Sequence, residues 1–157
     1  MRVVQTVTVL KLPRMKKNEV EKLIEEQFLC RIAFRGADYP YIAPFQYVFM
    51  NGTLYFHFTA YGRKMKLMEK DKQVCVEIEQ YKPDLSQYMF VTLKGKLGIV
   101  RDSAERAEVI RRMRETGKKR LSRNFLAALL RLLAKVSAPN RLLVTKSIMS
   151  FILIPFS

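Results

Sequence analysis

The chain has 157 residues, 49% of them hydrophobic, and a formal net charge of +15. This length predicts a single domain over residues 1–157 that folds on one core and buries roughly two thirds of the surface of the unfolded chain. No apolar run is long enough for a membrane-spanning helix, and the first residues lack the apolar block and cleavage site of a signal peptide. These absences predict a cytoplasmic protein.

The positive charge is concentrated in the second part of the sequence. Residues 94–157 carry 15 basic and 4 acidic side chains, a net charge of +11, whereas residues 1–93 carry 14 and 10. A basic excess attracts nucleic acid, anionic lipid and phosphorylated ligands alike. Charge alone therefore does not identify the partner.

The chain is predicted to begin with a strand over residues 3–10, followed by a helix that Asn18 caps and that ends near Gln27. Three strands follow at residues 30–34, 41–50 and 53–60. The predicted buried positions of the helix are Val20, Leu23 and Ile24. The Asn51-Gly52 pair between the last two strands is a strong signal for a tight hairpin, so we expect antiparallel pairing.

The second half of the sequence alternates helices and long strands. Helices are predicted at residues 62–71, 102–117 and 122–136, and strands at 73–80, 89–100 and 141–154. Gly95 and Gly98 indicate a bend that curls the sheet. In the helix that opens with the capping pair Asp102 and Glu105 and stops at Gly117, the expected buried positions are Ala107, Ile110 and Met113. Together the elements predict an α+β fold, a small closed or split antiparallel β-barrel of about six or seven strands with peripheral helices.

The helix at residues 62–71 carries its charges in an unfavourable order. Met65 and Met68 are spaced to face a core, while Arg63 and Lys64 crowd the positive end of the helix dipole after Gly62. A phosphate monoester bound there would compensate both cations. Simple solvation of the two side chains is an equally open alternative at this point.

The strand at residues 53–60 separates an apolar face from a polar face. Leu54, Phe56 and Phe58 alternate with Tyr55, His57 and Thr59. His57 is the only histidine, and its place beside the cationic helix makes it a weak candidate for a catalytic proton or hydrogen-bond donor. A purely structural hydrogen bond explains it equally well.

The stretch PYIAPFQYVFMNGTLYFHFTAYGRKMKLMEKDKQVCVEIE resembles the flavin-binding core of the pyridoxamine 5'-phosphate oxidase-like split-barrel superfamily, especially its nitroimidazole-resistance branch. The resemblance runs from about Cys30 to Val100. It implies an FMN-dependent oxidoreductase that acts on a small molecule at a homodimer interface.

The resemblance also implies roles for individual residues. Arg63 and Lys64 would hold the FMN phosphate. The ribityl chain and phosphate would lie against His57, Phe58 and Thr59, and the isoalloxazine ring would face the backbone of Ala43, Pro44, Phe45 and Gln46. Thr92 falls near the family's contact from the partner subunit.

The sequence departs from the family at its C-terminal end. It ends SFILIPFS, without the basic segment of the pyridoxamine phosphate oxidases proper, so oxidation of vitamin B6 is not expected. The helix at residues 122–136 is longer and more basic than the branch predicts. Its apolar stripe consists of Phe125, Leu129, Leu132, Leu133 and Val136. We expect this stripe to pack in the core or at a dimer interface, and membrane association is the less favoured alternative.

Three functional hypotheses remain open. The first is FMN chemistry, the second is the same fold holding a deazaflavin or haem, and the third is a noncatalytic protein that binds nucleic acid or membrane. Aromatic residues are not interleaved with the basic run over residues 101–123, so we expect no nucleic-acid partner. Cys30 and Cys75 read as reduced core residues, and no metal-ligand cluster, catalytic triad or phosphate-binding loop motif is present.

Overall fold

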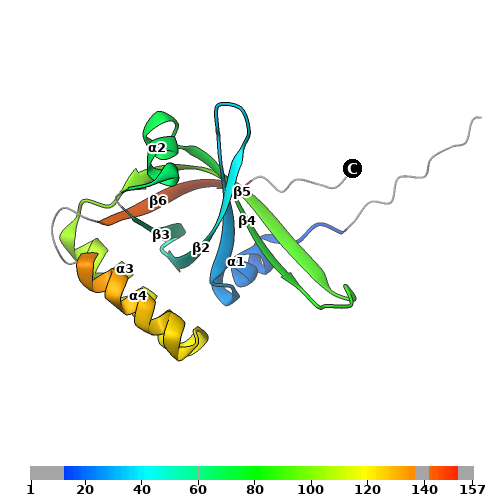
Figure 1. Cartoon of the computed structure of the whole chain (residues 1–157). Helices are drawn as coiled ribbons and strands as arrows, with labels where there is room; N and C mark the ends of the chain where they lie inside the picture. Colours follow the sequence, from blue (N-terminus) through cyan, green and yellow to red (C-terminus); the bar gives the residue numbers. More distant parts are fainter. Residues whose placement is uncertain (1–12, 60, 137–141, 152–157) are drawn as a thin grey trace, which may run out of the picture.

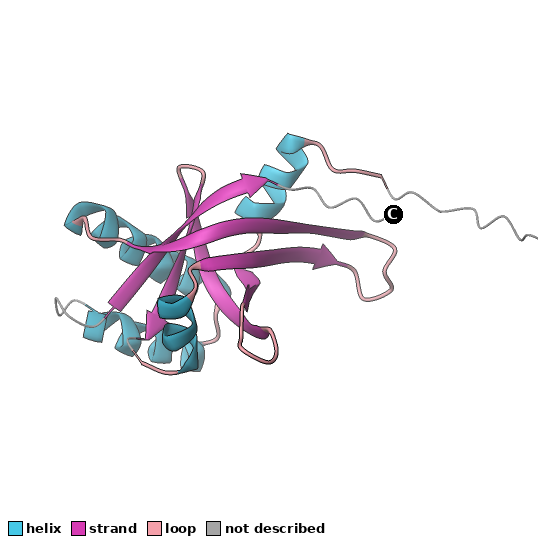
Figure 2. Cartoon of the chain, turned by 90° about the horizontal axis from the view of Figure 1, so that it is seen from above, coloured by secondary structure: helices cyan, strands magenta, loops and turns pink. Residues whose placement is uncertain are grey.

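The computed structural model describes residues 13–59, 61–136 and 142–151. In this part of the chain the strands form one curled sheet and the helices lie at its ends and on one flank (Figures 1 and 2). The strands are β1 (Leu29–Phe34), β2 (Tyr41–Met50), β3 (Thr53–Thr59), β4 (Gln73–Tyr81), β5 (Tyr88–Ile99) and β6 (Leu142–Phe151). The helices are α1 (Lys17–Glu26), α2 (Arg63–Lys70), α3 (Ser103–Arg120) and α4 (Arg123–Val136).

The six strands close into an antiparallel barrel in the order β1-β2-β3-β6-β5-β4. β1 completes the ring because Ile32 lies opposite Ala43 of β2 and also opposite Val76 of β4. The β2–β3 hairpin turns at Asn51 and Gly52, which both have positive φ, as its sequence predicts. The α+β barrel is therefore confirmed, while the strand predicted over residues 3–10 lies outside the described residues.

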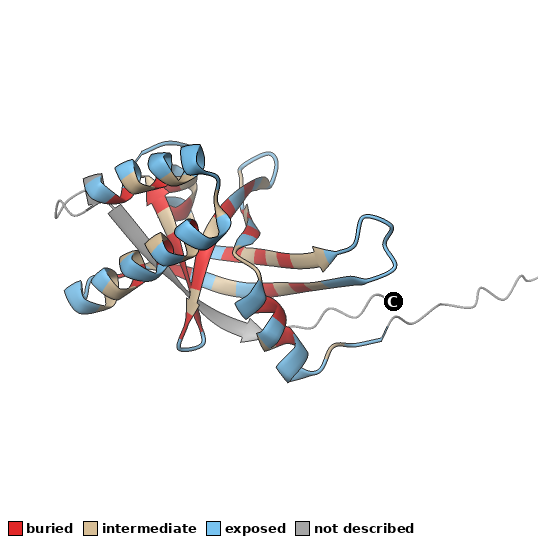
Figure 3. Cartoon of the chain, turned by 90° about the horizontal axis from the view of Figure 1, so that it is seen from below, coloured by how far each residue is buried: buried red, intermediate tan, exposed pale blue. Residues whose placement is uncertain are grey.

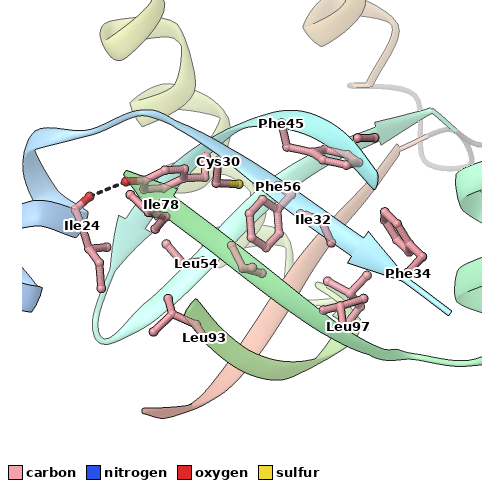
Figure 4. Close-up of a cluster of buried hydrophobic side chains, with 14 of the residues drawn as sticks. Ile24, Cys30, Ile32, Phe34, Phe45, Leu54, Phe56, Ile78, Leu93 and Leu97 are labelled. Carbon is pink, nitrogen blue, oxygen red and sulfur yellow. Dashed lines mark hydrogen bonds between the residues drawn. The ribbon is translucent and has the colours of Figure 1, made fainter. Parts of the chain in front are cut away.

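The interior of the barrel is filled by alternate side chains of the strands. In β1 the inward residues are Cys30, Ile32 and Phe34, and in β3 they are Leu54, Phe56 and Phe58, as the alternation predicts. Figure 4 shows this cluster, together with the hydrogen bond that the Tyr47 hydroxyl donates to the Ile24 carbonyl oxygen at 2.7 Å.

Two helices contribute to the same core. α1 inserts the three apolar side chains predicted for it, and α2 buries Met65 and Met68, as expected. The predicted cap of α1 is wrong, since the N-cap is Lys16 and not Asn18. The Glu19 carboxylate accepts a hydrogen bond from the Lys16 backbone N–H at 2.6 Å and so fixes the earlier start.

A second, smaller core lies outside the barrel, where α3 and α4 cover β2 and β3. Its buried residues are Val48, Met50 and Tyr55 of the hairpin, Val100 after β5, and Val109, Met113, Leu129 and Leu133 of the helices. The expected phase of α3 is partly wrong, because Ala107 is exposed and Ile110 only half-buried, while Val109 is buried. Figure 3 shows buried residues on the sheet side of this helix pair and exposed residues outside.

Gly117 does not stop α3, contrary to the sequence-based expectation. The helix continues to Arg120, and Gly117 is buried in its last turns. A Cβ atom at this position would lie 2.9 Å from Cδ2 of Leu129 and 3.2 Å from Cδ1 of Leu126. The glycine therefore serves the close crossing of α3 and α4, and its conformational freedom is not used to end the helix.

The apolar stripe of α4 is divided between core and solvent. Leu129 and Leu133 are buried, as expected, whereas Phe125 is 62% exposed and Leu132 is 41% exposed. Core packing is therefore confirmed for Leu129 and Leu133, while for Phe125 and Leu132 packing at a dimer interface stays a prediction. For Val136 inward packing stays a prediction.

The outer face of β1, β4 and the first half of β2 is open to solvent in the single chain. Leu29 is 50% exposed and Ile42 is 62% exposed, and Arg31 pairs there with Glu77 and Glu79. Cys75 of β4 is half-buried rather than part of the core, which corrects its sequence-based placement, and it is a free thiol like Cys30. Burial raises the pKa of the Cys30 thiol well above its usual range.

Candidate functional site

The barrel opens where β2 and β3 separate. Their ladder runs only from Met50 opposite Thr53 to Tyr47 opposite Phe56. Residues 41–46 of β2 pair with β1 alone, so their other backbone edge lacks a ladder to β3. Pro44 lies in this stretch. Because β3 does not pair here, the N–H group that proline lacks is not needed for a hydrogen bond to β3.

Helix α2 begins at this opening. Gly62 is its N-cap with φ of 97°, a left-handed conformation that favours glycine, and no side chain caps the helix. Just before it, the Thr59 hydroxyl donates to the carbonyl oxygen of Tyr61 at 3.0 Å. The first N–H groups of a helix have no partner within the helix, so this terminus presents donors and the positive end of the dipole.

Arg63 and Lys64 lie over aromatic rings of β2. The Arg63 guanidinium carbon is 4.9 Å from the centroid of the Tyr41 ring, and the Lys64 ammonium nitrogen is 4.6 Å from that of Phe45. Neither cation forms an ion pair with any carboxylate of the described residues. Arg63 is exposed and Lys64 half-buried, so solvent and the rings share the two cations, and the phosphate contact stays a prediction.

A ring is a weaker partner for a cation than a phosphate. A cation–π contact at an exposed site contributes about 0.5–1 kcal/mol. A hydrogen bond to a charged group contributes about 1.5–3 kcal/mol. The rings thus hold the two side chains near the helix start without neutralising their charge, and a bound dianion would gain both cations and the free N–H groups.

His57 lies close enough to this positive cluster to be affected by it. Burial is the larger cause that lowers the pKa of its imidazole, and the positive charge of Lys64 is the second. The imidazole is therefore mostly neutral at pH 7. The positive charge of Lys64 therefore acts on the end of β3 as well as on the start of α2.

Not all of the expected polar face of β3 is available to a ligand. Tyr55 is buried under α3 and donates a hydrogen bond to Oε1 of Glu105 at 2.6 Å. Burial and this carboxylate raise the pKa of Tyr55 to about 12. Only His57 and Thr59 of this face remain half-buried beside the opening.

The β2 residues predicted to bind the ring point alternately into the barrel and out of it. Ala43 and Phe45 point into the barrel, so they offer only backbone groups on the outside, whereas Pro44 is exposed and Gln46 half-buried. Phe58 is likewise buried in the barrel. The structure brings the β2 backbone, the end of β3 and the two cations to one opening.

Thr92 is not part of that opening within one chain. It lies on β5 opposite Glu77 of β4, and β4 and β1 separate it from β2. Three inter-strand spacings correspond to about 14 Å. The contact of Thr92 with the ligand, from a second chain, stays a prediction.

Sequence reasoning missed the rings beneath the cations. Tyr41 and Phe45 share one face of β2, since four residues separate them, and that parity was the available signal. It also missed the ion pair of Arg35 with Asp71 at 3.3 Å, which links the end of α2 to the β1–β2 hairpin.

Among the described residues no group of acidic, histidine and cysteine side chains is arranged to hold a metal ion. No described helix has the length and apolar character needed to cross a membrane.

A family comparison agrees with this architecture. The model of the pyridoxamine 5'-phosphate oxidase family matches residues 16–134. The chain belongs to this family, and its curled barrel is the family's split barrel. A comparison with curated proteins gives no match.

Solved structures share the fold at low sequence identity. An FAD-binding protein from Mesorhizobium loti superposes with a TM-score of 0.66 and 15% identity, covering 88% of this chain and 92% of that one. A protein from Bacteroides thetaiotaomicron with a provisional assignment to 5-nitroimidazole antibiotic resistance superposes with a TM-score of 0.62 and 16% identity. The match covers 96% of this chain and 92% of that one. The heme storage protein HutZ from Vibrio cholerae superposes with a TM-score of 0.61 and 16% identity, covering 89% of this chain and 92% of that one. At these identities the likeness establishes the fold and nothing about the ligand.

Proposed function

We propose that the protein binds FMN in the opening between β2 and β3 and acts as an FMN-dependent oxidoreductase on a small molecule, in the manner of the nitroimidazole-resistance branch. The phosphate would lie at the start of α2, between Arg63 and Lys64. The ribityl chain would follow the end of β3, and the ring would lie along the backbone edge of residues 41–46.

One observation carries this proposal, the two cations without carboxylate partners at an uncapped helix start. Two cations held together at the positive end of a helix dipole destabilise the helix unless a bound anion compensates their charge. Inorganic phosphate would satisfy this requirement too. The adjacent β2 edge favours a larger ligand, because backbone N–H and C=O groups there lack a ladder partner and suit a planar heterocycle with hydrogen-bonding edges.

FMN, when bound, would supply the redox chemistry. The chain would hold the phosphate through Arg63 and Lys64 and shield the ring edge with Pro44 and Gln46. A neutral His57 has one donor and one acceptor nitrogen. It would therefore form a hydrogen bond with the ribityl chain or with the substrate.

A homodimer would complete the site. The open outer face of β1, β2 and β4 carries apolar side chains beside a compact ion-pair cluster, a composition typical of subunit interfaces. In such a dimer Thr92 of the partner subunit would contact the ligand. A flat ring held in a shallow opening is also better protected from water by two subunits.

The test is the identity of the bound cofactor in the purified full-length protein. We expect a flavin absorption spectrum, and mass spectrometry of the released ligand should give FMN. Removal of the ligand and titration with FMN and riboflavin should show much tighter binding of FMN, because only FMN carries the phosphate. A haem spectrum, a deazaflavin mass, or equal affinity for both flavins would contradict the proposal.

A further inference from the structure

Helix α4 carries an exposed apolar flank that packs against no core in the described part of the chain. Phe125 is 62% exposed and Leu132 is 41% exposed, and Ala128 between them is exposed as well. The intervals of three and four residues place these side chains along one side of the helix. They form a continuous apolar strip, which we name the outer flank of α4.

A different side of the helix anchors α4 to the protein. Leu129 and Leu133 are buried in the second core, against Val109 and Met113 of α3. Because these contacts lie on the inner side, the outer flank is free while the helix stays docked. Figure 3 shows exposed residues along the outside of the helix pair.

Cations surround the outer flank. Lys118 and Lys119 lie in the last turn of α3, Arg123 begins α4 and Arg131 lies further along α4, all of them exposed. We name the corner over residues 118–123 the α3–α4 turn. None of these four forms an ion pair with a carboxylate of the described residues. In the full sequence no acidic residue follows Glu115, although eight basic residues do.

We propose that the outer flank of α4 and the α3–α4 turn bind the surface of an anionic lipid membrane. The helix would lie in the plane of the surface with Phe125 and Leu132 among the acyl chains and the cations at the headgroups. A basic helix with one apolar side is suited to this boundary. Its 14 residues span about 21 Å, which is enough to lie on a bilayer and too little to cross it.

Other occupants fit the surface less well. A second copy would bring two strongly basic surfaces together with no acidic group on the turn or on α4 to compensate them. Nucleic acid would satisfy the cations but would leave the aliphatic Leu132 and Ala128 without a suitable partner. An anionic bilayer satisfies both requirements, since it offers negative headgroups above an apolar layer.

The membrane site and the flavin site would operate separately. Figure 1 shows α2 above the barrel and α4 below it. The two helices also belong to different cores. Substitutions on the outer flank should therefore leave FMN affinity unchanged, so failure of one proposal can be told from failure of the other.

The experiment is sedimentation of the full-length protein with vesicles of phosphatidylcholine that contain roughly 30% phosphatidylglycerol. We expect binding at low salt that weakens as salt rises, and little binding to pure phosphatidylcholine. The double variant Phe125→Ser, Leu132→Ser should bind at least about tenfold more weakly, because it removes the apolar contribution. The double variant Lys118→Glu, Lys119→Glu should also lose at least about tenfold, through charge.

A matched control is available on other loops. Tyr39 and Leu85 are 78% and 65% exposed, so Tyr39→Ser, Leu85→Ser removes similar apolar surface elsewhere and should leave vesicle binding unchanged. The two serine variants should keep the unfolding midpoint of the parent, and the glutamate variant should lower it slightly, because anions at the C-terminus of α3 oppose the helix dipole. The proposal is overturned if the parent does not sediment with anionic vesicles at low salt, or if the outer-flank variant binds as well as the parent. It is also overturned if that variant loses self-association in the absence of lipid.

Discussion

The ammonium nitrogen of Lys64 lies 4.6 Å from the centroid of the Phe45 ring, and that ring belongs to the barrel core. The start of α2 is thus positioned against the barrel by an aromatic contact and not by an ion pair. A carboxylate in the same place would have neutralised the cation. The ring instead orients Lys64 while leaving its charge, together with that of Arg63, available to a ligand.

Replacing both cations by alanine should weaken the binding of FMN but not that of riboflavin. We expect Arg63→Ala with Lys64→Ala to weaken FMN binding by about a hundredfold or more, because each charge-assisted hydrogen bond contributes about 1.5–3 kcal/mol. Riboflavin affinity should barely change. Flavin fluorescence titrations of the ligand-free protein measure both constants.

The control for this variant lies on the same helix. Lys66 and Lys70 are exposed, and their double replacement by alanine removes the same charge from α2 without touching its start. We expect an FMN affinity within a fewfold of the parent. Equal losses of FMN and riboflavin in the Arg63 and Lys64 variant would instead show that the pair supports the fold.

His57 offers a direct probe of the field at the opening, because the sequence has one histidine. Its lowered pKa arises from burial and then from Lys64. A bound phosphate dianion would offset the positive charge, so FMN should raise the pKa of His57 more than riboflavin does. In the free protein, Lys64→Gln should also raise it. Titration of the imidazole proton resonances by NMR follows both, and a pKa that FMN leaves unchanged would place the phosphate elsewhere.

The same imidazole predicts a pH dependence of stability. A histidine whose folded pKa is lowered binds fewer protons in the folded state than in the unfolded state, so its contribution favours folding fully above the unfolded pKa of about 6.5. The free energy of unfolding should therefore fall as pH drops below that value toward the folded pKa. His57→Gln should flatten this part of the profile in urea unfolding. An equally steep fall in the variant would assign the effect to other groups.

Local signals in the sequence predicted most of the barrel and the start of α2. Asn51 and Gly52 determine a hairpin because few residue pairs adopt positive φ twice, and Gly62 marks the turn into α2 for the same reason. The spacing of Met65 and Met68 gave the buried side of that helix. These features depend only on neighbours in the chain, so a single sequence contains them.

Features that depend on contacts between distant segments were not predictable in the same way. Glycine is common at helix ends, so Gly117 predicts one. In the structure it instead allows Leu126 and Leu129 of the following helix to approach α3 closely. Tyr55 has the parity of a polar face, but α3 covers it. Whether Thr92 reaches the ligand depends on a second chain, which no pattern within one chain determines.

The hydrogen bond between Tyr55 and Glu105 should contribute to the docking of α3. Tyr55→Phe removes the donor from a buried site and should lower the free energy of unfolding by about 1–2 kcal/mol. A double-mutant cycle with Glu105→Ala, which removes the acceptor, measured by urea unfolding, isolates the pair from the other effects of each substitution. Independent, additive effects of the two substitutions would contradict a direct interaction.

Gly117→Val should destabilise the α3–α4 pair despite the better helix propensity of valine. The helix propensity of valine exceeds that of glycine by a few tenths of a kcal/mol. The new Cβ would lie 2.9 Å from Leu129 Cδ2 and 3.2 Å from Leu126 Cδ1. Overpacking of this kind costs about 1–3 kcal/mol, so the net change should be a loss of stability.

The exposed neighbour Lys118 supplies the control for this substitution. Lys118→Val changes the propensity of the same turn by a few tenths of a kcal/mol without meeting α4, so its urea midpoint should stay close to that of the parent. A Gly117→Val protein as stable as the parent would show that α4 shifts without cost. In that case Leu129 would not fix the position of α4 on α3.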